Sequence, residues 1–388
     1  MDDARTRLPA TRNLNVARMQ SLITPRSLKE SLPVDATSHA TVVGSRETIR
    51  AILAGRDPRF LALVGPCSIH DVEAANEYAR RLAQVREELS DRIVVMMRAY
   101  FEKPRSSLGW KGLINDPHLD GSFDMEAGLR MARGLLLSIT QLGLPAGTEM
   151  LDPITPQYID DLVSWAAIGA RTIESQTHRQ MASGLSMPVG YKNTTEGHLR
   201  PAIDAFAAAR NPHRFLGIDD DGRTCIIVTR GNPAGHIILR GGRTSPNYSP
   251  RRVAEATAQL EAAGLPARVV VDCSHSNSGK RPERQRVVWS SVVRQRAAGS
   301  TAIIGAMLES NLVGGRQELG EDPATLRYGV SITDACIGWE ETERLLRDAY
   351  RELGGAASRP KPARRIAARS ARSAVSSDLT RRARGRAR

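Results

Sequence analysis

Alternating strand-like and helix-like segments are the feature that most limits what this chain can fold into. Short apolar runs rich in β-branched residues predict strands, and the longer amphipathic segments between them predict helices. The predicted strands are 60–64, 93–97, 146–150, 168–173, 188–192, 214–218, 225–229, 236–240, 268–273 and 301–307. The predicted helices are 46–54, 72–88, 125–142, 156–166, 197–210, 250–263, 283–297 and 339–352.

This alternation favours parallel strands that are connected by helical crossovers. About eight such units fit a closed (β/α)8 TIM barrel better than an open sheet. The sequence contains no Gly-x-Gly-x-x-Gly or phosphate-loop motif that would support a nucleotide-binding open sheet. Because the strands predicted within 214–240 are too close together to have helices between them, part of that region is expected to form an inserted β-hairpin.

Three parts are expected along the chain: an N-terminal extension or arm (1–45), a catalytic barrel (46–353) and a disordered, Arg-rich tail (354–388). The formal net charge is +13, and the segment Arg359–Arg388 holds eleven Lys or Arg and one acid, so most of the positive charge belongs to the tail. The tail lacks apolar periodicity and is expected to be a solvated appendage, with nonspecific polyanion contacts at most.

The sequence also indicates in which cellular compartment the protein is expected. It has no apolar run long enough to span a bilayer, and its N-terminus does not resemble a signal peptide, so a cytoplasmic location is expected. The cysteines are too few and too widely spaced for a disulfide framework, which favours reduced thiols or metal ligation. They are Cys67, Cys225, Cys273 and Cys336.

Basic residues are concentrated in the segment 98–112, directly after the predicted strand 93–97. Pro104 interrupts regular structure there, so a loop is predicted, with the hydroxyl group of Ser106 among the cations. Arg offers a fork of donors and Lys a point charge, and phosphate and carboxylate groups bind both. The cations are Arg98, Lys103, Arg105 and Lys111. The segment taken alone fits an anion site or a solvated basic loop about equally well.

Polar side chains follow nearly every predicted strand, as expected for a barrel whose active site lies at the C-terminal strand ends. They are Cys67, Arg98, Glu149, Asp152, Arg171, Glu174, Lys192, Arg240, Asp272, His275 and Glu309, with Arg240 expected to close the inserted hairpin. Glu149 is accordingly predicted to contact substrate. Six cations on one face of a nearly neutral body indicate a substrate with phosphate and carboxylate groups. The six are Arg98, Lys103, Arg105, Arg171, Lys192 and Arg240.

A second group of residues combines a thiol, an imidazole and two carboxylates, which suits a divalent transition metal such as Mn, Fe, Co or Zn. It consists of Cys67, His275, Glu309 and Asp334. No short ligand spacing supports this hypothesis, and a buried structural cysteine with a hydrogen-bonded histidine is the alternative that the residues themselves leave open.

Several blocks of the sequence resemble the type I 3-deoxy-D-arabino-heptulosonate 7-phosphate (DAHP) synthases, in order and from about residue 15 to 352. Two of them read Gly65-Pro-Cys-Ser-Ile-His-Asp71 and Phe101-Glu-Lys-Pro-Arg-Ser-Ser107. The others are Gly109–Gly112, Ala167–Gln176, Pro188–Asn193, His236–Gly242, Asp272–Asn277 and Ile332–Trp339. The resemblance implies a TIM barrel that condenses phosphoenolpyruvate with erythrose 4-phosphate, the first step of the shikimate pathway to aromatic amino acids.

The resemblance also implies roles for residues at matching positions. The metal ligands would be Cys67, His275, Glu309 and Asp334, and the residues in contact with phosphoenolpyruvate would be Arg98, Lys103, Arg171, Lys192 and Arg240. Arg105 and Ser106 would bind erythrose 4-phosphate. Lys103, Cys67 and His275 are the predicted catalytic residues.

The family is commonly inhibited by an aromatic amino acid, and the run 174–188 looks most like that of the tyrosine-regulated isoenzymes. Pro156 and Ser186 fall at the family's effector site, although a turn proline and a loop serine are the plainer interpretation. A homodimer or homotetramer is expected by analogy. This chain departs from the family's usual threonines at Ser106, Ser107 and Ile173.

The sequence leaves two alternative functions open. The sister enzyme 3-deoxy-octulosonate 8-phosphate synthase shares the barrel and phosphoenolpyruvate but uses a five-carbon sugar phosphate, and its loop resembles Lys-Ala-Asn where this chain has Lys103-Pro104-Arg105. A polyanion-binding protein that acts through its basic tail is the non-enzymatic alternative, and it predicts salt-sensitive binding.

Overall fold

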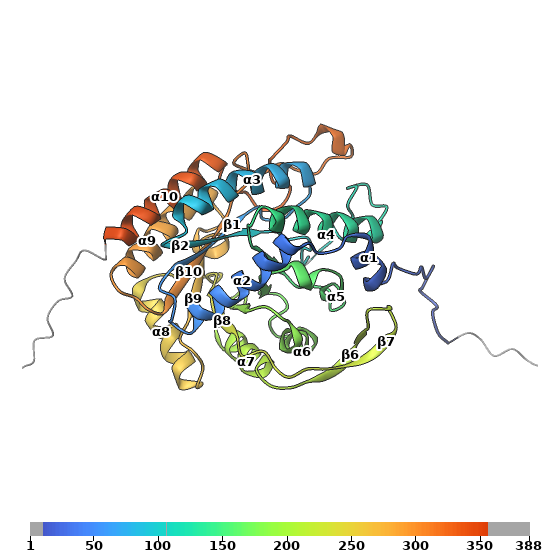
Figure 1. Ribbon diagram of the computed structural model, residues 1–388, viewed down its shortest axis with the longest axis horizontal. Coiled ribbons are helices and arrows are strands. Elements are labelled where there is room, and N and C mark those ends of the chain that lie inside the picture. The colour runs from blue at the N-terminus through green and yellow to red at the C-terminus, as the bar shows by residue number, and fades with distance from the viewer. Residues whose placement is uncertain (1–10, 106, 356–388) are drawn as a thin grey trace, which may run out of the picture.

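The computed structural model describes residues 11–105 and 107–355, and within them eight parallel strands close into a barrel (Figure 1). Around the barrel the strand order is β1-β10-β9-β8-β5-β4-β3-β2. The strands are β1 (Phe60–Gly65), β2 (Ile93–Arg98), β3 (Ala146–Glu149), β4 (Trp165–Ile168), β5 (Val189–Lys192), β8 (Gly235–Leu239), β9 (Val269–Asp272) and β10 (Ile303–Glu309). The predicted α/β barrel is therefore confirmed.

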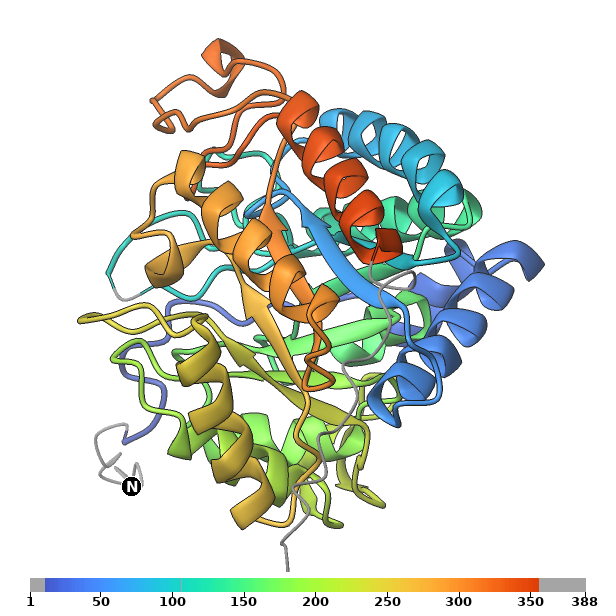
Figure 2. The same cartoon turned by 90° about the vertical axis from the view of Figure 1, so that its left-hand side faces the viewer.

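Helices cover the outside of the barrel, and two more belong to the N-terminal region (Figures 1 and 2). The outer helices are α3 (Val72–Leu89), α4 (Met125–Gln141), α5 (Pro156–Ile159), α6 (Gln176–Gly184), α7 (Arg200–Ala209), α8 (Pro250–Ala262), α9 (Gln285–Ala297) and α10 (Trp339–Gly355). The N-terminal helices are α1 (Pro25–Ser31) and α2 (Ala36–Leu53). No described helix is both long and apolar enough to cross a membrane.

Alternate residues of each strand enter two separate apolar clusters, because successive side chains point to opposite faces of a strand. In β1, Leu61 and Leu63 join the cluster inside the barrel, whereas Ala62 and Val64 pack against the surrounding helices. Both faces of these strands are buried, which explains why they read as continuous apolar runs in the sequence.

Helix α2 covers the end of the barrel at which the strands begin. Arg46 of α2 donates to the carbonyl of Val163 just before β4 (3.0 Å), and Arg268 just before β9 donates to the carbonyl of Leu53 (3.0 Å). Figure 2 shows α2 on the side opposite the long loop between β2 and α4. The polar ends of the strands therefore face the other opening of the barrel.

Several segments differ from the sequence-based prediction. The predicted helix 156–166 consists of the single turn α5 and a 3-10 turn, and β4 occupies 165–168 instead of 168–173. The Trp-Ala-Ala-Ile sequence of β4 is short, without alternation, and fits a helix equally well, so tertiary pairing with β3 and β5 decides its structure. Helix α6 was not predicted.

Helix α2 begins ten residues before the predicted 46–54 and therefore runs across residue 45, the expected limit of the arm. The side chain of Asp35 caps it by accepting from the backbone N–H of Ser38 (2.8 Å). Thr37, Thr41 and Val42 lower the helix propensity of the first turns, which hid the start of the helix. The division of the chain into parts stays a prediction, and the tail beyond residue 355 lies outside the described residues.

The inserted hairpin is formed by the antiparallel strands β6 (Arg214–Ile218) and β7 (Thr224–Val228). The expectation that Arg240 closes this hairpin is wrong, because Arg240 follows the barrel strand β8. The hairpin extends toward α1 (Figure 1), where Arg26 and Lys29 pair with Asp221 and Asp220 at 2.7 and 3.2 Å. The N-terminal arm therefore contacts the tip of the hairpin.

We expect His236, which is buried in β8, to make the fold sensitive to acid. Trp165 Nε1 donates to His236 Nε2 (2.9 Å), and burial lowers the pKa of His236 to about 4. The unfolded chain binds this proton near pH ~6.5, so the stabilisation is complete above that pH and is lost as the pH falls to about 4. The free energy of unfolding should fall by about 3 kcal/mol more for the wild type than for His236→Gln over this interval. Urea denaturation with equal pH slopes for the two proteins would contradict this assignment.

Candidate active site

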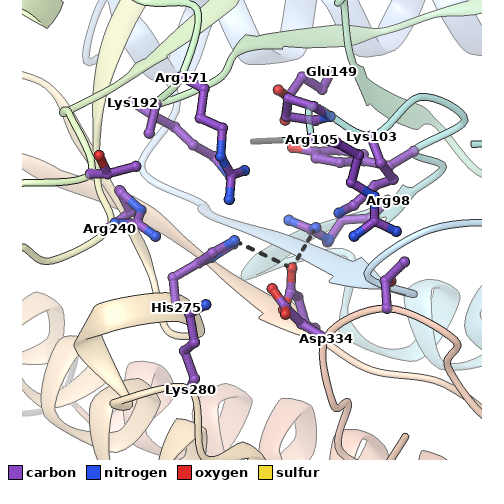
Figure 3. A pocket seen from close by; sticks show the side chains of 16 residues that line it. Arg98, Lys103, Arg105, Glu149, Arg171, Lys192, Arg240, His275, Lys280 and Asp334 are labelled. Carbon is purple, nitrogen blue, oxygen red and sulfur yellow. Dashed lines mark hydrogen bonds and ion pairs between the residues drawn. The ribbon is translucent and has the colours of Figure 1, made fainter. Parts of the chain in front are cut away.

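A polar pocket lies where the barrel strands end (Figure 3). Its walls come from the ends of β2, β3, β5, β8 and β10 and from the loops that follow β2, β4, β9 and β10. The titratable residues that line it are Arg98, Tyr100, Lys103, Arg105, Glu149, Arg171, Lys192, Arg240, His275, Lys280, Glu309 and Asp334. The six cations singled out in the sequence are thus in one pocket.

Three of these cations are almost completely buried. Arg98, Lys192 and Arg240 are 1%, 4% and 6% exposed. Arg98 Nη2 donates to Glu309 Oε1 (3.2 Å), but Nε and Nη1 have no hydrogen-bond partner among the described residues. Burial of an unpaired donor on a charged group is costly, so these nitrogens point to an anionic ligand.

Lys192 and Arg240 have weaker internal partners. Lys192 Nζ lies 3.3 Å from Asp272 Oδ2, and Arg240 Nη1 donates to Ser276 Oγ (3.3 Å). Burial lowers the pKa of Arg240, and the positive charge of Arg171 adds to this effect, while Asp272 opposes it. The pocket therefore keeps positive charge that an incoming anion would stabilise.

Lys103 connects the cations with the thiol group. Its Nζ lies 3.2 Å from both Sγ and the carbonyl oxygen of Cys67. Burial alone would lower the pKa of Lys103, but Cys67, Glu309 and Glu149 raise it above its usual value. The ammonium group therefore stays protonated within the pocket.

Three of the four predicted metal ligands form one compact group. Ligand atoms of Cys67, Glu309 and Asp334 lie within 4.8 Å of one another. His275, the fourth, places Nε2 3.8 Å from Glu309 Oε1, while its Nδ1 lies 3.0 Å from Asp272 Oδ2. A thiol, an imidazole and carboxylates at these separations could hold a divalent transition metal ion.

Glu149 ends β3 and carries its carboxylate into the pocket. It is 7% exposed, and Oε1 has no hydrogen-bond partner among the described residues. Gly169 makes room for this side chain, because a Cβ at position 169 would lie 2.0 Å from Glu149 Oε1. Glu149 is thus a carboxylate held next to a ring of cations.

Several predicted site residues lie elsewhere. Lys111 does not line the pocket: its carbonyl accepts from the backbone N–H of Lys103 (2.8 Å), and it borders a neighbouring opening. Ser106 lies outside the described residues. Pro156 begins α5, and Ser186 Oγ lies 3.5 Å from Oδ2 of Asp160, which follows that helix. Neither of these predicted effector residues lines the pocket.

Tyr100 and Lys280 line the pocket but were not assigned to it from the sequence. Tyr100 lies two residues after Arg98, and the two-residue repeat of a strand would have placed both on one face. Lys280 lies in a turn with positive φ values, which are 51° at His275, 63° at Gly279 and 59° at Lys280. Ser278-Gly279 is a turn signal in the sequence, but it does not indicate that the Lys280 side chain enters the pocket.

The geometry of the pocket agrees with the sequence comparison. The model of the DAHP synthetase I family matches residues 31–347. The chain belongs to this family. Its members include the Tyr-sensitive phospho-2-dehydro-3-deoxyheptonate aldolase of Escherichia coli (strain K12), which is 54% identical over 89% of this chain and 97% of its own length.

Relatives that are named for sensitivity to other amino acids are about as similar to this chain. The Phe-sensitive enzyme of the same strain is 54% identical over 86% of this chain and 95% of its own length. The Trp-sensitive enzyme of that strain is 51% identical over 87% of this chain and 96% of its own length. The solved structure of the aldolase from Francisella tularensis SCHU S4 is 46% identical, covers 88% of this chain and 99% of its own, and has a TM-score of 0.85. Sequence identity therefore does not indicate which aromatic amino acid would be the effector of this chain.

We expect inorganic phosphate to stabilise the protein, because it can pair with the buried cations. Binding with a Kd of about 1 mM would add about 1.4 kcal/mol at about 10 mM phosphate. Thermal unfolding at constant ionic strength should show a higher Tm with phosphate than with chloride. Arg240→Gln should lose most of this shift, whereas Arg243→Gln, a matched change at an exposed arginine paired with Glu196, should keep it. Equal shifts in both variants would contradict an anion site at Arg240.

Proposed function

We propose that this chain condenses phosphoenolpyruvate with D-erythrose 4-phosphate and water, and releases 3-deoxy-D-arabino-heptulosonate 7-phosphate and phosphate. The observation that carries the proposal is that one pocket of a DAHP synthetase I family member is lined by seven described Lys or Arg residues and by three of the candidate metal ligands, His275, Glu309 and Asp334. Two substrates that each carry a phosphate, one of them also a carboxylate, account for this excess of positive charge.

Phosphoenolpyruvate binds among the deep cations in this proposal. Arg98 offers Nε and Nη1, the two buried donors that lack a described partner. Lys103, Arg171, Lys192 and Arg240 supply the remaining positive charge around them. A carboxylate and a phosphate on a small rigid molecule would each be paired there, which fixes the orientation of the enol carbon that reacts.

Erythrose 4-phosphate binds at the rim, where Arg105 meets its phosphate, together with Ser106. Arg105 is held by its own loop, because its Nε donates to the carbonyl of Trp110 (2.7 Å). The side chain is therefore oriented before the sugar arrives, which reduces the entropy lost on binding.

The reaction forms one carbon–carbon bond and one carbon–oxygen bond, from C2 to the water oxygen, and it breaks the bond between C2 and the phosphate oxygen. A proton lost by the water goes to the alkoxide that forms from the aldehyde. C3 of phosphoenolpyruvate attacks the aldehyde carbon of the sugar, water adds at C2, and the phosphate group then leaves C2. Cys67, His275, Glu309 and Asp334 would hold a divalent ion, which we propose to be Mn, Fe, Co or Zn, and this ion would supply Lewis-acid polarisation of the aldehyde oxygen. Lys103 holds a proton at Nζ beside the reacting atoms, and Glu149 contacts the substrate.

An aromatic amino acid inhibits the enzyme in this proposal, with Pro156 and Ser186 in the effector site. Support comes from relatives that are named Tyr-, Phe- and Trp-sensitive. We also propose a homodimer or homotetramer, by analogy with the family.

The substrate assignment is tested by phosphate release from phosphoenolpyruvate with each of two sugar phosphates. Erythrose 4-phosphate should be consumed faster than arabinose 5-phosphate, and the reverse order would favour the sister octulosonate enzyme. Arg105→Gln should raise KM for erythrose 4-phosphate on the order of 10-fold or more, because a charge-assisted hydrogen bond is lost. Lys111→Gln, a matched change in the same loop outside the pocket, should leave this KM within about twofold of the wild type.

Metal removal tests the ligand assignment. Excess chelator should abolish turnover, and added Mn or Co should restore it. Cys67→Ala should contain less metal per chain by elemental analysis and should not recover activity at ordinary metal concentrations, because a thiolate ligand is missing. Cys225→Ala removes a half-buried thiol from the hairpin and should retain both metal and activity. Full activity of the wild type in excess chelator would refute the assignment.

A further inference from the structure

Tyr100 lies against two buried cations of the pocket. It is 1% exposed and follows β2 two residues after Arg98. The Cζ atom of Arg98 lies 4.2 Å from the centroid of the Tyr100 ring, and Lys192 Nζ, which comes from β5 across the barrel, lies 5.8 Å from the same centroid. A single aromatic ring thus contacts cations from two different strands.

An aromatic face differs from a carboxylate as a partner for these cations. Two buried positive charges repel each other and need a partner that fixes their positions. A carboxylate would occupy their N–H donors and neutralise them, whereas a ring attracts them through its quadrupole and leaves the charge and the donors available. Arg98 and Lys192 each have one described carboxylate partner, Glu309 and Asp272, at 3.2 and 3.3 Å. Glu309 engages only Nη2 of Arg98, and Nε and Nη1 remain without a described hydrogen-bond partner beside the ring.

The hydroxyl group of Tyr100 takes no part in these contacts. It is buried and has no hydrogen-bond partner among the described residues. Burial raises the pKa of Tyr100 above its usual value, although Arg98 opposes the shift, so the phenol stays neutral at physiological pH. The face of the ring, and not a phenolate, therefore meets the cations.

We propose that Tyr100 is a positioning residue whose ring holds Arg98 and Lys192 in place to receive the anionic groups of phosphoenolpyruvate. This inference rests on the proposed function, because it concerns how that substrate is bound. Tyr100 then affects KM for phosphoenolpyruvate through Arg98 and Lys192. Its hydroxyl group does not contact the substrate.

The test compares steady-state kinetics of variants at two buried tyrosines. Tyr100→Leu should raise KM for phosphoenolpyruvate on the order of 10-fold, with KM for erythrose 4-phosphate within about twofold of the wild type. Tyr100→Phe keeps the ring and should restore KM for phosphoenolpyruvate to within about threefold. Tyr191→Leu is the matched control: Tyr191 is also fully buried with an unpartnered hydroxyl group, but it stacks on Phe206 at 5.4 Å outside the pocket. It should lower Tm without changing KM.

A further substitution keeps the test decisive if Tyr100→Leu does not fold. Pentafluorophenylalanine at position 100 matches phenylalanine in shape but reverses the ring quadrupole, so its KM for phosphoenolpyruvate should exceed that of Tyr100→Phe several-fold. Equal KM values for these two rings would overturn the proposal, as would a Tyr100→Phe variant as impaired as Tyr100→Leu, which would implicate the hydroxyl group. A wild type that does not turn over phosphoenolpyruvate with erythrose 4-phosphate would refute the proposed function instead.

Discussion

The ion pair between Arg98 and Glu309 is the contact on which the rest of the pocket depends. Its side chains are 1% and 2% exposed and come from β2 and β10, strands that both pair with β1. Glu309 Oε1 also lies 3.8 Å from His275 Nε2, so one carboxylate oxygen faces both the proposed anion site and the candidate metal ligands. Loss of either partner would leave a buried charge unpaired, which is far more costly than breaking a surface pair. The two halves of the site are therefore coupled through this one oxygen.

The barrel supplies the rigidity that this arrangement needs. Short strands with both faces buried fix the positions at which Arg98, Glu149, Lys192 and Glu309 leave the sheet, and α2 closes the opposite end. The charged groups then meet at one opening although they are far apart in the sequence. Without that convergence, like charges would separate into solvent, where each would be hydrated independently.

The sequence was sufficient to predict most strands, the inserted hairpin and the gathering of the six cations, because buried strands have an unambiguous apolar pattern with polar residues at their ends. It failed at β4, whose Trp-Ala-Ala-Ile run has no periodicity and is decided by pairing with its neighbours. Lys280 was missed because Ser278-Gly279 marks a turn but not the direction in which the next side chain points. The separations within the site, such as those of under 4.8 Å among Cys67, Glu309 and Asp334, depend on barrel closure, which no local pattern contains.

Gly169 illustrates how a residue without a functional group can behave like part of an active site. Any Cβ there would collide with the carboxylate of Glu149, so even alanine would push that carboxylate out of place. In a saturation screen for activity, position 169 would then be as intolerant as the charged residues around it. Tolerance to substitution therefore depends on the space that a charged group occupies as well as on the group itself. In this barrel the carboxylate comes from the end of β3, and the glycine that leaves space for it follows β4.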